Sequence, residues 1–412
     1  MKVLLVTPVP PQADGGGAIP VLLYAQLLGL RRLHDVTLVT AIGDEPGQVE
    51  AVEQLRSEVE VHAADRRRPG PGPRRLRRQL RLATRWVRGP WPWRTVWYAD
   101  PGIQAILDRL AAKPDFDVVA VEDSAMSVFR YPAGVASVFT HHEVLRPRAL
   151  SRPPGAPRDW PGWAYREIDW RRWAGFQRRA WNSFDLVEVF SRRDAETLVE
   201  LAPEVAPRVR VDPFGLVLPP AADPGREVPG TVLFVGHFAH SPNRDAAHWL
   251  VGEIMPAVRT RFPGARLRIV GSEPPPEIEA LARPDVEVIA DAPSVLPHLE
   301  QAAVVLAPVR TGGGMRMKVL QAMAAGKAVV TTVRGREGYD CFGEEPPLAV
   351  ADDEGGIAAT TAALLEDGER RRALGERARA FAERHCGPDP WARRMTAVYE
   401  EARAIRAGGT GG

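Results

Sequence analysis

Short apolar runs alternate with longer mixed segments along the whole chain. In the first half, apolar runs predict strands at 3–7, 36–40, 118–121, 135–140 and 186–190, and a helix is expected from about Ala18 to Arg32. In the second half, strands are predicted at 231–236, 266–271, 286–290, 304–309 and 328–332, and a helix at 245–262. Strands that alternate with helices are typical of parallel sheets built from βαβ units. The pattern therefore predicts an α/β protein with two Rossmann-like domains.

A proline-rich stretch, 213–230, separates the two halves and is predicted to be a linker. A chain of 412 residues is too long for one ordinary core. We expect an N-terminal domain over residues 1–212 and a C-terminal domain over 231–388. The segment 389–412 is expected to form a helix that packs back on the N-terminal domain, followed by a flexible tail.

Two glycine-rich loops follow predicted strands, Gly15–Gly17 in the first half and Gly312–Gly314 in the second. Glycines between a strand and a helix leave backbone N–H groups accessible at the helix N-terminus, where the helix dipole favours an anion. Arg316 and Lys318 add two positive charges to the first turn of the next helix, predicted at 316–325, where they oppose that dipole. A bound phosphate would offset this cost. A tight turn beside two solvated cations is the alternative.

Ligands of such sheets bind beyond the carboxyl ends of the strands. We therefore expect both glycine loops to face one cleft between the two domains.

The composition limits the class of protein. A net charge of +2 argues against a general nucleic-acid binder, and two cysteines, Cys341 and Cys386, give neither a disulfide framework nor a cysteine metal cluster. The N-terminus lacks the pattern of a signal peptide, and no apolar run approaches the ~20 residues that span a bilayer. These features predict a cytoplasmic, enzyme-sized protein.

Several segments, in order, resemble the retaining glycosyltransferases of family 4, whose GT-B architecture has two facing Rossmann-like domains with a cleft between them. The similarity is strongest in the second half and looser in the first. The segments that carry it are 233–246 (L-F-V-G-H-F-A-H-S-P-N-R-D-A), 263–271, 286–310 and 312–330, with Gly15–Gly17 and V-F-T-H-H-E at 138–143.

The resemblance implies transfer of a sugar from a nucleoside diphosphate donor to an acceptor hydroxyl, with retention of the anomeric configuration. The acceptor would be a natural product or a polysaccharide or lipid-linked precursor. Fixed cations and backbone N–H groups can stabilise a departing diphosphate. No metal and no other cofactor are therefore expected, and no nucleic-acid partner.

Site residues follow from the same resemblance. Arg316 and Lys318 would hold the diphosphate, and His142 matches the family's cleft histidine. Neighbouring side chains in a strand point to opposite faces, so only one of His141 and His142 can face the cleft, and a purely structural role stays open. The donor-binding residues implied are Gly236, His237, Asn243, Gly271, Ala292, Gly313, Gly314, Met315 and Gln321, and the acceptor-side loop is Gly15, Gly16 and Gly17.

The chain departs from the family pattern at three positions. His237 stands where many members have a phosphate-binding arginine, and Asn243 and Arg244 are candidates to compensate, although Arg244 also suits a solvated helix start. Gly313 and Gln321 fall where the family has two acids. A glycine at the first of these positions is typical of a subgroup of the family that has the motif G-G-x-R-x-K.

Gln321 replaces the acid that holds the donor ribose. An amide can bond a hydroxyl, but it lacks the carboxylate charge that strengthens such bonds. Two hypotheses follow: a tolerated ribose contact, or a catalytically impaired subunit that binds sugar nucleotide or acts as a scaffold.

Arginine and tryptophan are concentrated in two segments, 66–97 and 159–181. Three interpretations remain open: a variable surface segment with tryptophans packed on arginine stems, acceptor recognition, and peripheral membrane contact through 66–97.

Among other enzyme classes, a sugar-nucleotide epimerase shares the architecture. An NAD-dependent dehydrogenase is disfavoured because the first strand is not followed by G-x-G-x-x-G.

Overall fold

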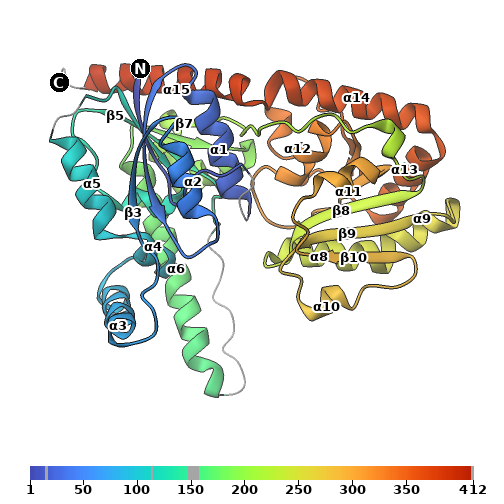
Figure 1. Ribbon diagram of the computed structural model, residues 1–412, viewed down its shortest axis with the longest axis horizontal. Helices are drawn as coiled ribbons and strands as arrows, with labels where there is room; N and C mark the ends of the chain where they lie inside the picture. Colours follow the sequence, from blue (N-terminus) through green and yellow to red (C-terminus); the bar gives the residue numbers. More distant parts are fainter. Residues whose placement is uncertain (14–16, 113–114, 147–156, 410–412) are drawn as a thin grey trace. The chain divides into compact units, whose positions relative to one another are not determined.

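The computed structural model describes residues 1–13, 17–112, 115–146 and 157–409. The chain divides into two compact units (Figure 1). The first contains Met1–Asp212 and the stretch from Ala392 on, and the second contains Pro213–Trp391. Each unit has its own parallel sheet.

The first unit has a seven-stranded sheet in the order β3-β2-β1-β4-β5-β6-β7. Its strands are β1 (Lys2–Val6), β2 (Asp35–Ile42), β3 (Glu60–Asp65), β4 (Val118–Glu122), β5 (Ala136–His141), β6 (Leu186–Val189) and β7 (Val209–Val211). Its helices are α1 (Ala18–Leu30), α2 (Gln48–Leu55), α3 (Pro73–Arg88), α4 (Trp93–Tyr98), α5 (Pro101–Ala111), α6 (Trp160–Asn182), α7 (Arg192–Leu201) and α15 (Pro388–Gly409), and a 3-10 turn, η1 (Ser124–Val128), follows β4.

The second unit has a six-stranded sheet in the order β10-β9-β8-β11-β12-β13. Its strands are β8 (Thr231–His237), β9 (Arg266–Ser272), β10 (Val286–Ala290), β11 (Val304–Ala307), β12 (Ala328–Thr331) and β13 (Ala349–Val350). Its helices are α8 (Ser241–Trp249), α9 (Met255–Arg261), α10 (Pro276–Glu279), α11 (Leu296–Gln301), α12 (Met317–Ala324), α13 (Glu354–Glu366) and α14 (Gly368–His385). All described strand pairs in both sheets are parallel.

The central strands are buried on both faces. Consecutive residues Val3, Leu4, Leu5 and Val6 of β1 are all inaccessible to solvent, although alternate side chains point to opposite sides of the sheet. Burial on both faces requires apolar residues at every position, which is why these strands read as continuous apolar runs. The expected α/β fold with two Rossmann-like domains is confirmed.

Both sheets reverse their strand order at one point. In the first unit the chain adds β2 and β3 on one side of β1 and then places β4 on the other side. In the second unit β8 and β11 are the corresponding neighbours. Loops on either side of such a reversal diverge beyond the carboxyl ends of the strands, where open α/β sheets bind ligands.

The helix predicted at 245–262 is interrupted. A π-helical turn at Leu250–Ile254 separates α8 from α9. Pro256 lies in the first turn of α9 and has no N–H to donate to the preceding turn. A wider turn before a proline accommodates this missing hydrogen bond.

Residues 213–230 make backbone hydrogen bonds within the second unit. The N–H groups of Leu216, Ala222 and Val228 donate to the carbonyls of Cys386, Ala325 and Gln301. At the other end of the chain, α15 joins the first unit through ion pairs of Arg394 with Asp212, Arg403 with Asp117 and Arg406 with Asp185. No helix in the described part of the chain is long and apolar enough to cross a membrane.

Candidate functional site

In the second unit, polar side chains meet at the carboxyl ends of β8 and β11, where the strand order reverses. Lys318, in the first turn of α12, donates from Nζ to Oδ1 of Asn243 at 2.6 Å. Asn243 in turn donates from Nδ2 to the carbonyl of His237, the last residue of β8, at 2.7 Å. The structure therefore brings together three residues that the sequence comparison placed at the donor.

The ammonium of Lys318 lies above the ring of Phe234, 4.4 Å from its centroid. Burial, together with the smaller effect of the Arg316 charge, lowers the pKa of Lys318 to about 7. No carboxylate pairs with Lys318 among the described residues. A bound anion would restore the charged form of this lysine.

The glycine loop has the backbone that its sequence indicates. Gly312 and Gly314 have φ values of 86° and 77°, a region that residues with a side chain rarely adopt. Arg316 folds back and donates from Nη1 to the carbonyl of Gly313 at 2.6 Å, and its own carbonyl accepts from the Tyr339 hydroxyl at 2.7 Å. The loop is thereby held against the start of α12.

Other predicted donor residues have identifiable local roles. A β-carbon on Gly271 would lie 1.7 Å from the carbonyl oxygen of Gly236, so this pair permits the close approach of β8 and β9. His237 is bonded through Nδ1 to Ser272 Oγ at 2.8 Å. Met315 is buried, and Ala292 follows β10, at the edge of the sheet.

Arg244 and Gln321 differ in their surroundings. Arg244 donates to the carbonyls of Phe238 and Ala239, which stabilises the turn before α8. This contact supports a structural role rather than a solvated side chain. Gln321 is half-buried, and no described residue is hydrogen-bonded to its amide, which leaves that group available to a ligand.

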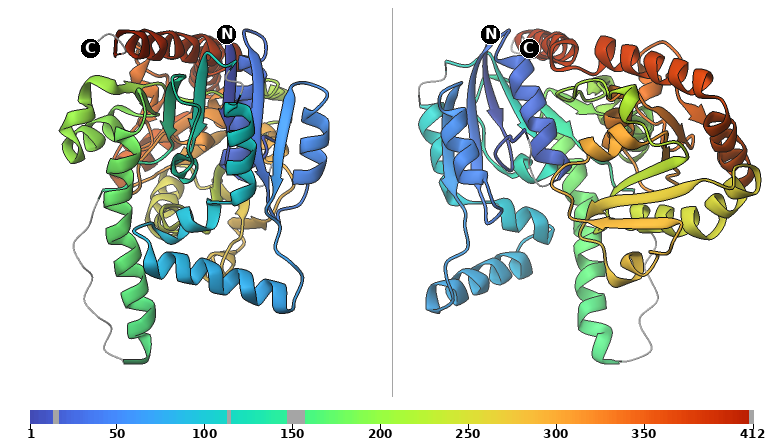
Figure 2. Two further views of the ribbon diagram at one scale, coloured as in Figure 1. Left: turned by 90° about the vertical axis from the view of Figure 1, so that its left-hand side faces the viewer. Right: turned by 45° about the vertical axis from the view of Figure 1, so that its right-hand side comes forward.

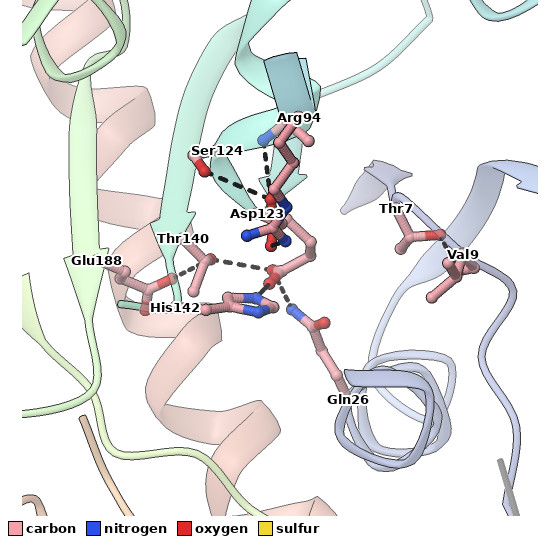
Figure 3. A network of polar contacts seen from close by, with 11 residues as sticks. Thr7, Val9, Gln26, Arg94, Asp123, Ser124, Thr140, His142 and Glu188 are labelled. Atoms are coloured by element: carbon pink, nitrogen blue, oxygen red, sulfur yellow. Dashed lines mark hydrogen bonds and ion pairs between the residues drawn. The ribbon is translucent and has the colours of Figure 1, made fainter. Parts of the chain in front are cut away.

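In the first unit, a buried polar network surrounds Glu122, the last residue of β4. Figure 3 labels its partners Gln26, Thr140 and His142. The Glu122 carboxylate accepts from Gln26 Nε2 at 2.5 Å and from the Thr140 hydroxyl at 2.9 Å, and is bonded to His142 Nε2 at 2.9 Å. Burial raises the pKa of Glu188 well above its usual range, and Asp212 and Glu122 raise it further. Protonated Glu188 can donate to the Thr140 oxygen 3.2 Å away, whose own proton points to Glu122.

Asp123 follows Glu122 and has a strained backbone, with φ of 69°. It pairs with Arg94 of α4 at 2.6 Å and accepts from the Ala125 N–H at 2.8 Å (Figure 3). Burial alone raises the pKa of Asp123, but the charges of Arg94 and His142 outweigh it and hold the pKa below its usual value. A strained, charged residue at this edge of the sheet is a functional candidate.

The two neighbouring histidines have different environments. His141 is buried, accepts at Nδ1 from Trp181 Nε1 at 2.9 Å and stacks on Phe139. Burial lowers the pKa of His141 to about 3. The His142 side chain is 13% exposed and bonded to Glu122, which fixes the orientation of its ring. Of the two, only His142 is accessible to a ligand.

Sequence reasoning missed Glu122, Asp123 and Arg94. Their signal was the pair of acids that directly follows the apolar run 118–121. Of the predicted acceptor-side loop, Gly15 and Gly16 lie outside the described residues. Gly17 precedes α1 with φ of 115°.

Comparison with known proteins identifies the class of fold. Residues 229–367 match the family described as Glycosyl transferases group 1. HepE of Anabaena, solved with UDP and glucose, is 12% identical with a TM-score of 0.65, over 97% of this chain and 100% of that one. Sucrose-phosphate synthase from Thermosynechococcus elongatus is 17% identical with a TM-score of 0.65, over 98% and 99% of the two chains. No curated protein sequence matches the chain.

The chain therefore has a two-domain GT-B fold, and the family match lies within its second unit. At these identities the likeness to solved structures defines the fold alone.

The pKa of His141 leads to a prediction about acid stability. Between about pH 6.5 and 3, the unfolded state binds a proton on this histidine and the folded state does not, so the free energy of unfolding falls as the pH decreases. The contribution is about 1.4 kcal/mol per pH unit. In urea unfolding between pH 6.5 and 4, His141→Phe should reduce this slope by about that amount.

Phe139→Leu is the matched control, because it removes the ring that stacks on His141 without removing a titrating group. It should lower stability and retain the wild-type slope. An unchanged slope in His141→Phe would contradict the assignment.

Proposed function

We propose that the protein is a glycosyltransferase that moves a sugar of the hexosyl type from a nucleoside diphosphate sugar to an acceptor hydroxyl, with retention of configuration. The observation that carries the proposal is the cluster of Lys318, Arg316 and the Gly312–Gly314 loop at the strand reversal of the second unit. HepE, which shares the fold, was solved with UDP and with UDP-glucose, which supports a donor of this class.

In the proposed mechanism the chain stabilises the diphosphate as it leaves. Lys318 and Arg316 supply two positive charges, and the N–H groups at the start of α12 supply a favourable dipole. These groups are fixed before the reaction, so they need little reorganisation as charge develops. In this mechanism these groups stabilise the diphosphate without a metal ion. Gln321, one turn after Lys318, would contact the donor ribose.

The acceptor hydroxyl would be oriented by the first unit. His142 is held by Glu122, and Asp123 by Arg94, so both groups present fixed hydrogen-bonding positions. In a single-step transfer, retention requires the hydroxyl to attack from the face that the diphosphate leaves. The acceptor would be a natural product or a polysaccharide or lipid-linked precursor.

A second candidate is a catalytically impaired subunit that binds sugar nucleotide or acts as a scaffold. It is favoured by one observation, the amide of Gln321 where an acid is expected. Donor binding without sugar transfer or donor hydrolysis would support this candidate.

Donor binding should be linked to proton uptake by Lys318. A diphosphate raises the pKa of this lysine from about 7, so at pH 8 binding takes up close to one proton, and affinity falls about tenfold per unit as the pH rises above 7. Calorimetric titration of wild type with UDP or another nucleoside diphosphate, in buffers of different ionisation enthalpy, measures the uptake.

Lys318→Arg is the control, because arginine stays charged throughout this range. It should bind without proton uptake, whereas Lys318→Ala should bind about 10- to 100-fold more weakly. Equal uptake in wild type and Lys318→Arg would reject this role of Lys318.

Sugar transfer itself tests the function. His142→Ala should abolish transfer while donor affinity stays within about twofold of wild type, because His142 lies in the first unit and the donor residues in the second. NMR of the product shows whether the anomeric configuration is retained. Wild-type turnover in His142→Ala removes this residue from the site, and an inverted product overturns the retaining mechanism.

We also propose that α3 contacts an anionic membrane surface. Leu76, Leu80 and Val87 are 57%, 58% and 64% exposed and lie on one face of this helix. Arginines 77, 81 and 88 flank that face, and α3 contains no acid. An apolar stripe beside a row of arginines is complementary to anionic lipid head groups.

The protein should co-sediment with vesicles of phosphatidylglycerol and phosphatidylcholine at low salt. The double substitution Leu76→Glu and Leu80→Glu should weaken this binding at least tenfold, whereas Leu33→Glu, at an exposed leucine outside α3, should not. Absence of binding at low salt, or burial of the stripe in a dimer in solution, overturns the membrane contact.

A further inference from the structure

A charged side chain without a hydrogen-bond partner lines a cavity in the first unit. Arg66, directly after β3, is 7% exposed, and its Nε and Nη1 have no partner among the described residues. Its guanidinium lies over the Tyr98 ring, 4.0 Å from the centroid. Stacking of this kind engages the face of the guanidinium and leaves its in-plane N–H donors unsatisfied.

Arg66 lines a cavity of about 150 Å³ at the carboxyl edge of the sheet. Its Nη2 would lie 3.7 Å from a β-carbon on Gly43, another lining residue. The cavity lining includes Val9, beyond β1, and Gly43, beyond β2, in addition to Arg66. The volume equals that of a cavity that holds one aromatic ring. Strands β3, β2 and β1 are consecutive in the sheet, and β4, which ends at Glu122, is the next neighbour. The cavity therefore lies on the same sheet edge as Asp123 and His142.

The carboxylates that line this cavity are engaged elsewhere. Asp44 pairs with Arg68, with Oδ2 2.9 Å from Nε, and Glu45 accepts from the amide of Gln48 at 3.1 Å. Neither neutralises Arg66. A second arginine is close, since Arg78 donates from Nη2 to the carbonyl of Arg66 at 3.2 Å. Burial lowers the pKa of Arg78, and the charge of Arg66 lowers it further.

A larger cavity of about 260 Å³ adjoins the first and shares Arg68 and Trp97 with it. Leu82, Trp93 and Trp97 form an apolar side, and Arg75 and Arg78 add positive charge. The cavity uses the inner face of α3, which Figure 2 shows running crosswise to the long helix α6. Its volume suits a ring system rather than a single ion.

We propose that these two cavities bind an acidic small molecule, whose carboxylate or phosphate monoester is held by Arg66 and whose ring lies against Trp93 and Leu82. Arginine suits both anions, because its guanidinium keeps its charge at every working pH and donates N–H groups to carboxylate and phosphate oxygens alike. The identification of this molecule as the sugar acceptor rests on the proposed function. The existence of the anion site does not depend on that function.

Equilibrium binding to the full chain, without donor, tests the site. The probes are benzoate, phenyl phosphate, inorganic phosphate and the neutral ester methyl benzoate, measured by calorimetry. Benzoate or phenyl phosphate should bind, and the tighter of the two identifies the anion. Methyl benzoate should bind at least tenfold more weakly, and inorganic phosphate more weakly than phenyl phosphate because it leaves the larger cavity empty.

Arg66→Met should weaken binding of the anionic probe about 10- to 100-fold, because it keeps the stem and removes the fork. Arg81→Leu is the matched control, since it removes the same charge from the exposed face of α3 and should change affinity less than twofold. Without probe, Arg66→Met should raise the Tm, because it removes a buried charge that lacks a partner. A folding defect would appear instead as a lower Tm.

The site is overturned if neither anion binds, if methyl benzoate binds as tightly, or if Arg66→Met retains wild-type affinity. Binding of inorganic phosphate as tight as that of phenyl phosphate overturns the role of the larger cavity. If the anion binds but no transfer occurs with any acceptor, the proposed function fails and the site stands. If transfer occurs, Arg66→Met should raise KM for acidic acceptors alone and leave kcat unchanged.

Discussion

Parallel pairing of strands that are buried on both faces is the constraint on which the other features of this protein depend. A strand such as β1 has no exposed position between Val3 and Val6 for a polar side chain. Polar chemistry can enter only where strands end, and in a parallel sheet the carboxyl ends share one edge. Lys318, Asn243 and His237 meet there in the second unit, and Glu122, Asp123 and His142 in the first.

The buried charges of the first and second units are balanced in different ways. The carboxylate of Glu122 accepts from Gln26 of α1 and Thr140 of β5 and is bonded to His142, just beyond β5, so the chain itself satisfies this charge and holds His142 in one orientation. Lys318 and Arg66 instead keep positive charges in partly or fully buried positions without an opposite charge beside them. A buried cation of this kind lowers the stability of the free protein, and an anion offsets that loss.

Much of the fold could be predicted from the sequence because burial on both faces requires uninterrupted apolar runs. The strands that were not predicted, β3, β7 and β13, all lie at sheet edges, where one side has no neighbouring strand. In E-V-H-A-A-D of β3 the polar residues hide the pattern. The site was only partly predictable. The glycine loop and Lys318 could be predicted from local chemistry. Arg66, Arg67 and Arg68, however, are three consecutive arginines that the sequence alone does not distinguish. Only the fold separates buried Arg66 from its neighbours, which pair with Asp65 and Asp44.

The position of α15 has a consequence for how the protein is made. Its ion pairs with Asp117, Asp185 and Asp212, and its buried Met395 and Tyr399, complete the first unit, yet it follows the second unit in the sequence. During synthesis, residues 1–212 leave the ribosome about 180 residues before the helix that covers them. The first unit therefore stays unfinished while the second folds, and a nascent chain that stops short of α15 exposes the core of the domain that was made first.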